Sequence, residues 1–65
     1  MLDQLNELKG CFWTKLDELV KEIEELGLEV ELAYEEYIEA VTEDEEIFTL
    51  YLHGAGNTIA ITDIK

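Results

Sequence analysis

The chain has 65 residues, of which 17 are acidic and 4 are Lys or Arg, so its formal net charge at pH 7 is −13. A surface this negative repels nucleic acid and anionic membranes, which excludes both as direct partners and favours a basic protein. Hydrophobic residues make up 48% of the chain, enough to form a core, so we predict one small folded domain over residues 1–65 rather than a disordered segment.

The cysteine content and the hydropathy of the chain indicate in which cellular compartment the protein is found. The single cysteine, Cys11, excludes an internal disulfide and favours a reducing environment. The N-terminal residues lack the basic and apolar regions of a signal peptide, and no apolar run is long enough to span a bilayer. We therefore expect a cytoplasmic protein.

Apolar residues at helical spacing dominate the N-terminal part of the chain. We expect an amphipathic helix over about residues 3–26, ended by Gly27 in a left-handed conformation. Gly10 is a position where this helix could kink or break, since Thr14 followed by Asp17 resembles a second helix start. The apolar stripe consists of Leu2, Leu5, Phe12, Leu16, Leu19, Ile23 and Leu26.

After Gly27 the apolar period changes to two, which is typical of strands. Residues 28–34 alternate as a half-buried strand, residues 47–53 are apolar on both faces, and residues 58–64 alternate again after a glycine loop. The stretch 35–41 is left open between strand, bulge and helix. The predicted fold class is α+β, with an N-terminal amphipathic helix packed on one face of a three-stranded antiparallel meander in the order α-β-β-β.

One helix can cover only one face of such a sheet. We expect the other face to present Ile47, Tyr51 and Ile64, which is more apolar than solubility requires. Because a core of this size is short of buried surface, this face is predicted to be an interface, either with another protein or with a second copy as a homodimer. The alternative is that these apolar residues simply remain exposed.

The uncompensated charge is concentrated in residues 28–46, which contain no Lys or Arg. Carboxylates on alternate strand residues lie about 6.6 Å apart and can imitate a phosphate backbone, which attracts proteins whose grooves are lined with Lys and Arg. Tyr34, Tyr37 and Tyr51 would add aromatic anchors. The alternative is a solvated surface that keeps a small domain soluble. The acids of this predicted partner-binding face are Glu29, Glu31, Glu35, Glu36, Glu39, Glu43, Asp44, Glu45 and Glu46.

Catalysis and metal binding have little support in the sequence. Cys11 and His53 are the only nucleophile and base that could pair, and we expect Cys11 to be a small buried hydrophobe and His53 a surface residue. Residues 43–46 lack the spacing of a calcium loop, and residues 54–57 lack that of a phosphate loop, so both are predicted to be turns. We expect no enzyme activity, no metal and no cofactor.

In size, charge and acidic strand, the chain is similar to the small acidic inhibitors that bacteriophages encode against host nucleic-acid enzymes. Uracil-DNA glycosylase inhibitors and several anti-CRISPR proteins belong to that class. The similarity lies in general character and in no signature motif, so it assigns no site residues. It implies a DNA-mimic inhibitor, acting in the host cytosol, that occludes the basic surface of a nucleic-acid-handling protein. The alternative is a homo-oligomeric structural or adaptor module that buries the open sheet face on itself.

Overall fold

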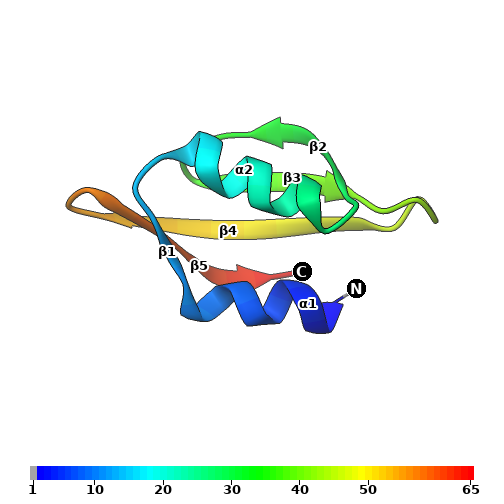
Figure 1. Ribbon diagram of the computed structural model, residues 1–65, viewed down its shortest axis with the longest axis horizontal. Coiled ribbons are helices and arrows are strands. Elements are labelled where there is room, and N and C mark those ends of the chain that lie inside the picture. The colour runs from blue at the N-terminus through cyan, green and yellow to red at the C-terminus, as the bar shows by residue number, and fades with distance from the viewer. Residues whose placement is uncertain (1) are drawn as a thin grey trace.

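The computed structural model describes residues 2–65, which fold into helices packed against an antiparallel sheet (Figure 1). The predicted α+β class is therefore confirmed. Along the sheet the strand order is β1-β5-β4-β3-β2, and every neighbouring pair is antiparallel. The elements are α1 (Leu2–Glu7), the 3₁₀ turn η1 (Leu8–Gly10), β1 (Phe12–Trp13), α2 (Leu16–Glu25), β2 (Glu29–Ala33), β3 (Tyr37–Val41), β4 (Ile47–Ala55) and β5 (Thr58–Ile64).

The single helix expected over residues 3–26 is wrong, because the chain leaves the helix at Gly10. Glycine is a poor helix former, and the residues that follow it, Phe12 and Trp13, pair with β5 as an edge strand. The Trp13 side chain is buried, and its indole N–H donates a hydrogen bond to the Glu22 carboxylate of α2. The helix breaks at Gly10 because the strand that follows buries the Trp13 side chain and covers the edge of β5.

The second helix begins and ends close to the predicted signals. α2 starts after Lys15, whose side chain makes no capping hydrogen bond. The Thr14 hydroxyl instead donates to the Glu18 carboxylate at 3.1 Å, one turn further along. At the other end Gly27 has φ +98° and its N–H donates to the carbonyl oxygen of Glu24 at 3.0 Å, which confirms the predicted left-handed residue. No helix within residues 2–65 combines the length and hydropathy needed to cross a membrane.

The predicted three-stranded meander is also wrong, because the chain forms more strands than the sequence pattern indicated. The undecided stretch 35–41 contains β3, which pairs with β2 on one side and β4 on the other. Ile38 and Ala40 of β3 are fully buried, which explains why this segment joins the sheet. The two acids that interrupt the alternation, Glu35 and Glu36, lie in the β2–β3 turn.

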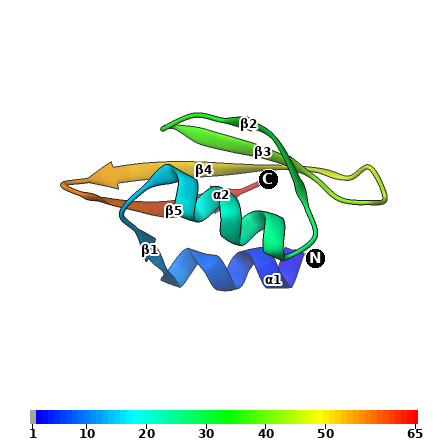
Figure 2. The same ribbon diagram turned by 45° about the horizontal axis from the view of Figure 1, so that its top comes forward.

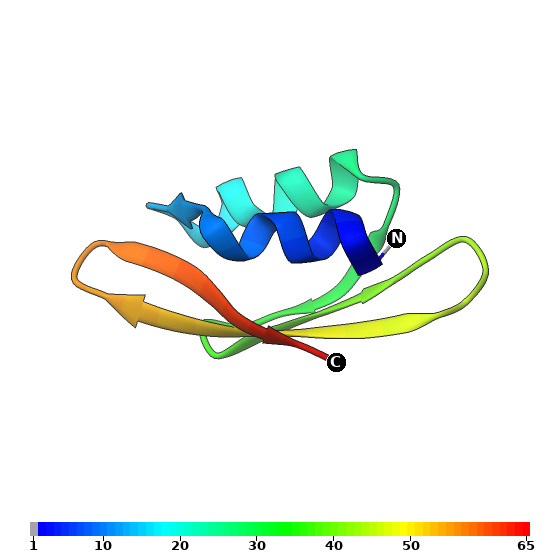
Figure 3. The ribbon, with the colours of Figure 1, turned by 90° about the horizontal axis from the view of Figure 1, so that it is seen from below.

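The helices cover one face of the sheet and leave the opposite face uncovered, as seen from two directions (Figures 2 and 3). The hydrophobic core lies between these two layers. Burying one large aliphatic side chain stabilises a fold by roughly 1.5–3 kcal/mol, which offsets part of the conformational entropy lost on folding. The buried core residues are Leu5, Leu8, Trp13, Leu19, Ile23, Leu28, Ile38, Ala40, Leu50 and Ile61.

The loops that join β3, β4 and β5 are turns, as predicted, but the turn expected over residues 54–57 is confined to residues 56–57, because Gly54 and Ala55 pair with β5 as part of β4. Gly56, with φ +64°, is the first of two loop residues between β4 and β5, the position where a type II′ hairpin turn requires glycine. Between β3 and β4, the Thr42 N–H donates to the Glu46 carbonyl oxygen at 2.9 Å, and the Glu45 N–H donates to the Thr42 carbonyl oxygen at 3.0 Å. This acidic turn holds Glu45 in the left-handed region, with φ +66°.

Candidate functional site

The uncovered side of the sheet, which we call the open face, is defined by the strand register. Residues directly opposite each other in an antiparallel pair point to the same face. Ile38 lies opposite Leu50, and both are buried under the helices, so the neighbouring pair Tyr37 and Tyr51 points the other way. The residues of the open face are Phe12, Glu29, Leu32, Tyr37, Glu39, Val41, Ile47, Thr49, Tyr51, His53, Ala60, Asp63 and Lys65.

A β-bulge in the edge strand changes which side chains of β2 reach this face. The pairing of β2 with β3 shifts register between Val30 and Leu32, so Glu31 is an extra residue in the strand. Leu32 consequently lies opposite Glu39, on the open face, whereas strict alternation had placed it with Val30 under the helices. The expected regular row of glutamates along this strand is therefore interrupted by a leucine.

The tyrosines predicted as aromatic anchors lie together. The rings of Tyr34 and Tyr37 are 5.3 Å apart between centroids and tilted by 53°. Tyr51 lies directly opposite Tyr37 on the neighbouring strand, and the Lys65 ammonium lies 5.7 Å from the centroid of the Tyr51 ring. Tyr34 and Tyr37 thus form an aromatic pair, and Tyr51 lies on the neighbouring strand with a cation beside it.

Eight of the nine acids of the predicted binding face lie on the open face or at its ends rather than along one row, and the ninth, Glu31, is the bulged residue of β2. Glu29 and Glu39 lie on the face itself. Glu35 and Glu36 lie in the turn at one end of β3, and residues 43–46 form the turn at its other end (Figure 1). A five-residue strand separates these two groups of carboxylates by about 17 Å.

Carboxylates also occur on the helices, so negative charge alone does not distinguish the open face. These helical acids are Asp3, Glu7, Asp17, Glu18, Glu22, Glu24 and Glu25. The open face differs because it gathers several large apolar side chains that remain exposed among its acids, whereas α1 exposes one, Leu2. The exposed fraction is 39% for Leu32, 59% for Ile47 and 40% for Tyr51.

The predicted self-association residues do not all lie on the open face. Ile47 and Tyr51 do, but Ile64 lies opposite Leu50 and packs against the core on the helix side. The physical reason is a second register shift, between Tyr51 and Leu52 of β4, where β5 contributes an extra residue. The shift reverses the face to which Ile64 points, so its placement on the uncovered side was wrong.

Phe12 is an open-face residue that the sequence pattern had placed in the helical stripe. Its side chain is 71% exposed, and it lies opposite Ala60 at the far edge of the sheet from β2. The helix break at Gly10 is the local signal that could have indicated this position, because it removes Phe12 from the helical period.

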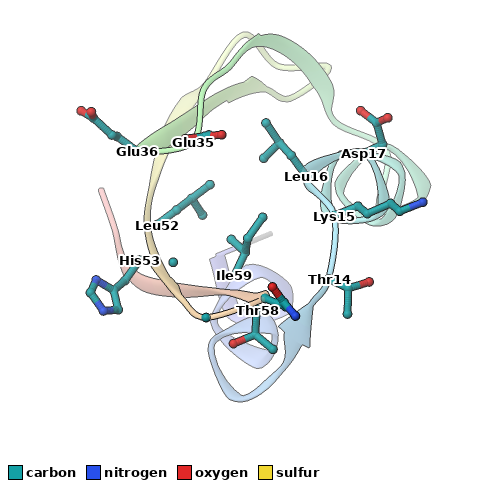
Figure 4. Close-up of a pocket in the computed structure, with 13 residues that line it drawn as sticks. Thr14, Lys15, Leu16, Asp17, Glu35, Glu36, Leu52, His53, Thr58 and Ile59 are labelled. Carbon is teal, nitrogen blue, oxygen red and sulfur yellow. The ribbon is translucent and has the colours of Figure 1, made fainter.

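A hollow of about 950 Å³ opens at one end of the layered structure, between the start of α2 and the β4–β5 hairpin (Figure 4). Leu16, Leu52 and Ile59 point into it. Asp17 and Glu35 are among the polar residues that line it. This hollow is an open end of the core, because its apolar lining continues into the packed layer between helix and sheet.

Cys11 and His53 do not line a common site. Cys11 is exposed, which contradicts its expected burial, because the chain turns out of η1 there instead of continuing as a helix. His53 is an exposed residue of β4, and its side chain points away from the hollow (Figure 4). β5 lies between β4, which carries His53, and β1, which directly follows Cys11. Because neighbouring strands are about 4.8 Å apart, two strand spacings separate the segments that carry these residues.

The acidic turn 43–46 is solvent-exposed. In residues 2–65, no three or more His, Cys, Asp or Glu side chains are grouped so that they could hold a metal ion.

The chain matches no protein-family model, no curated protein and no solved structure.

Proposed function

We propose that this protein is a non-enzymatic binding protein that docks its open face on the basic surface of another protein. The observation that carries the proposal is the uncovered sheet face, where Leu32, Ile47 and Tyr51 are exposed among carboxylates. An exposed apolar patch with a polar rim is typical of a protein–protein interface. The tyrosines supply the residue type that often dominates binding energy in such interfaces.

The charge of the protein determines which partner we propose. With a net charge of −13, it attracts basic surfaces and accelerates its encounter with them. Proteins that handle nucleic acid carry such surfaces, because they must neutralise phosphates. Carboxylates on a rigid sheet, with further groups at both ends of β3, would take the place of those phosphates. The proposed mechanism is competitive occlusion of a nucleic-acid-binding surface, as in the small acidic inhibitors of phages, acting in the host cytoplasm.

The alternative function, self-association through the same face, is less consistent with the arrangement of charge. Two copies meeting through this face would bring Glu29, Glu39 and Asp63 of one copy close to the like charges of the other. Juxtaposed like charges at an interface cost several kcal/mol. A homodimer would also have to form without Ile64, which lies on the covered face.

The proposal is tested by competition with DNA. The tagged protein is used to capture a partner from a host lysate at low salt, and the purified partner is then bound to fluorescent duplex DNA. We expect the acidic protein to displace the DNA, and the displacement to weaken as salt is raised from about 0.05 to 0.5 M, because charge pairs are screened. A partner that holds DNA and the acidic protein simultaneously would contradict the proposed occlusion.

A further inference from the structure

We propose that Tyr51, with Tyr37 opposite it on β3, forms a binding site for a cationic side chain, and that Lys65 contacts the Tyr51 ring of this site until an arginine of the partner replaces it. The Lys65 ammonium lies 5.7 Å from the Tyr51 ring centroid, inside the distance of about 6 Å at which a cation is attracted to an aromatic ring. The protein's own lysine thus marks a position on the open face that accepts positive charge. The inference deepens the proposed function, because it names the group by which the basic partner is recognised.

The aromatic surface extends beyond the ring that Lys65 contacts. Tyr37 lies directly opposite Tyr51 on β3, and the Tyr34 ring packs against Tyr37 at 5.3 Å between centroids. A single ammonium covers only part of this surface. A planar guanidinium, which stacks on aromatic rings and is less strongly hydrated than an ammonium, matches it better.

Two carboxylates lie next to the tyrosines, one across the sheet and one along β3. Asp63 of β5 lies opposite Tyr51, and its Oδ1 accepts a hydrogen bond at 2.9 Å from the N–H of Ile64, which fixes its position. Glu39 of β3 lies two residues from Tyr37 on the same face. Aromatic faces next to carboxylates offer an arginine both stacking and charge-assisted hydrogen bonds.

The backbone holds Lys65 beside this site while its side chain stays replaceable. The N–H and carbonyl oxygen of Lys65 exchange hydrogen bonds with Thr49, each at 2.9 Å. The side chain itself is exposed, and it ends in a strongly hydrated ammonium on a flexible stem. A partner's guanidinium can therefore displace the ammonium without disturbing the sheet.

The probe for the site is a short oligo-arginine peptide, acetylated and amidated at its ends, titrated into protein that carries ¹³C-labelled tyrosine and lysine. We expect NMR shifts at the rings of Tyr37 and Tyr51 and at the side-chain carbons of Lys65 as its ammonium is displaced. An oligo-lysine peptide of equal length should bind more weakly, because it stacks less well on the rings.

Two charge-matched variants separate the site from the general negative field. Lys65→Met and Lys21→Met each remove one positive charge, but Lys21 is an exposed residue of α2, on the helix side of the molecule. Lys65→Met should bind oligo-arginine roughly two- to fivefold more tightly than Lys21→Met, because the aromatic site is no longer occupied by an internal cation.

Two ring variants test the aromatic contribution. Tyr51→Leu should weaken peptide binding roughly two- to fivefold, whereas Leu2→Ala, which truncates an exposed side chain of α1 on the helix side of the molecule, should leave it unchanged. Tyr51→Phe keeps a ring and should retain binding, which controls for any loss of folding in Tyr51→Leu. Fluorescence of the buried Trp13 reports the fold in each variant.

The inference is overturned if the peptide does not bind, or if it binds without shifting the rings of Tyr37 and Tyr51. It is equally overturned if Lys65→Met and Lys21→Met bind the peptide with the same affinity. Because this peptide test uses no nucleic-acid-binding protein, its failure is distinguishable from failure of the proposed function, which depends on the competition with DNA.

Discussion

Leu32 lies directly opposite Glu39 across β2 and β3, on the face of the sheet that the helices leave uncovered. One extra residue, Glu31, causes this arrangement, because the side-chain period of a strand is two and a single inserted residue reverses the face of those that follow. The edge strand thereby contributes a leucine to the open face in place of a glutamate.

The position of Leu32 leads to a first prediction. Leu32→Gln should change the free energy of unfolding by no more than about 0.5 kcal/mol, because a surface position is being altered. Val30→Ala, on the helix side of the same strand, should destabilise by about 1 kcal/mol or more. Urea titrations followed by circular dichroism measure both. A larger loss for Leu32→Gln than for Val30→Ala would show that the bulge is placed wrongly.

The acidic β3–β4 turn contains local strain that can be relieved. Glu45 has φ +66°, a left-handed conformation that costs a residue with a side chain roughly 1–2 kcal/mol and that asparagine tolerates better. Glu45→Asn should therefore be more stable than Glu43→Asn by about 0.5–1 kcal/mol. Both variants remove one negative charge from the same turn, so equal urea midpoints would exclude strain at Glu45.

Self-repulsion should make the free protein more stable in salt. With 17 acidic residues and 4 Lys or Arg, screening of like charges should raise the thermal midpoint. For a domain of this size, about 1 kcal/mol of relieved repulsion corresponds to about 4–8 °C. Scanning calorimetry at low and high salt measures the effect.

A neutralised variant serves as the control for the salt effect. Replacing Glu29, Glu31, Glu35 and Glu36 with Gln should raise the midpoint at low salt and reduce its response to added salt. The same variant should lose partner binding if these acids form part of the interface. If added salt left the thermal midpoint of both the unmodified protein and the variant unchanged, repulsion between like charges would not limit the stability of the fold.

The edge strand β1 provides a test of the helix break. Trp13→Phe removes the hydrogen bond to Glu22 and part of a buried side chain, so it should destabilise the protein by about 1–2 kcal/mol. Phe12→Leu should cost little, because that side chain is 71% exposed. If Phe12→Leu cost as much as Trp13→Phe, the exposed position of Phe12 would be wrong.

Periodicity predicted those parts of the fold where one pattern dominates the chain. The shift from helical to strand period at Gly27, the central strand around Leu50 and the glycine turn at Gly56 all follow from local rules. The placement of Ile47 and Tyr51 on the same face of their strand also follows, because it depends only on alternation within that strand. These are local properties of short segments.

The remaining features depend on competition between distant segments. Whether the chain continues as a helix past Gly10 is decided by the pairing of Phe12 and Trp13 with β5, which is far away in sequence. The bulges that place Leu32 on the open face and Ile64 under the helices arise from cross-strand register. Register is a property of two strands together, so the pattern of either strand alone does not determine it.

The most direct test of the open face as the binding surface compares two charge-matched double variants. Glu29→Gln with Glu39→Gln removes two negative charges from the open face, and Glu24→Gln with Glu25→Gln removes two from exposed positions on α2. Both are titrated by calorimetry against the partner that competes with DNA. The open-face variant should bind about tenfold or more weakly than the helix variant, because its lost charges lie at the interface. Equal affinities, or a greater loss for the helix variant, would contradict the account.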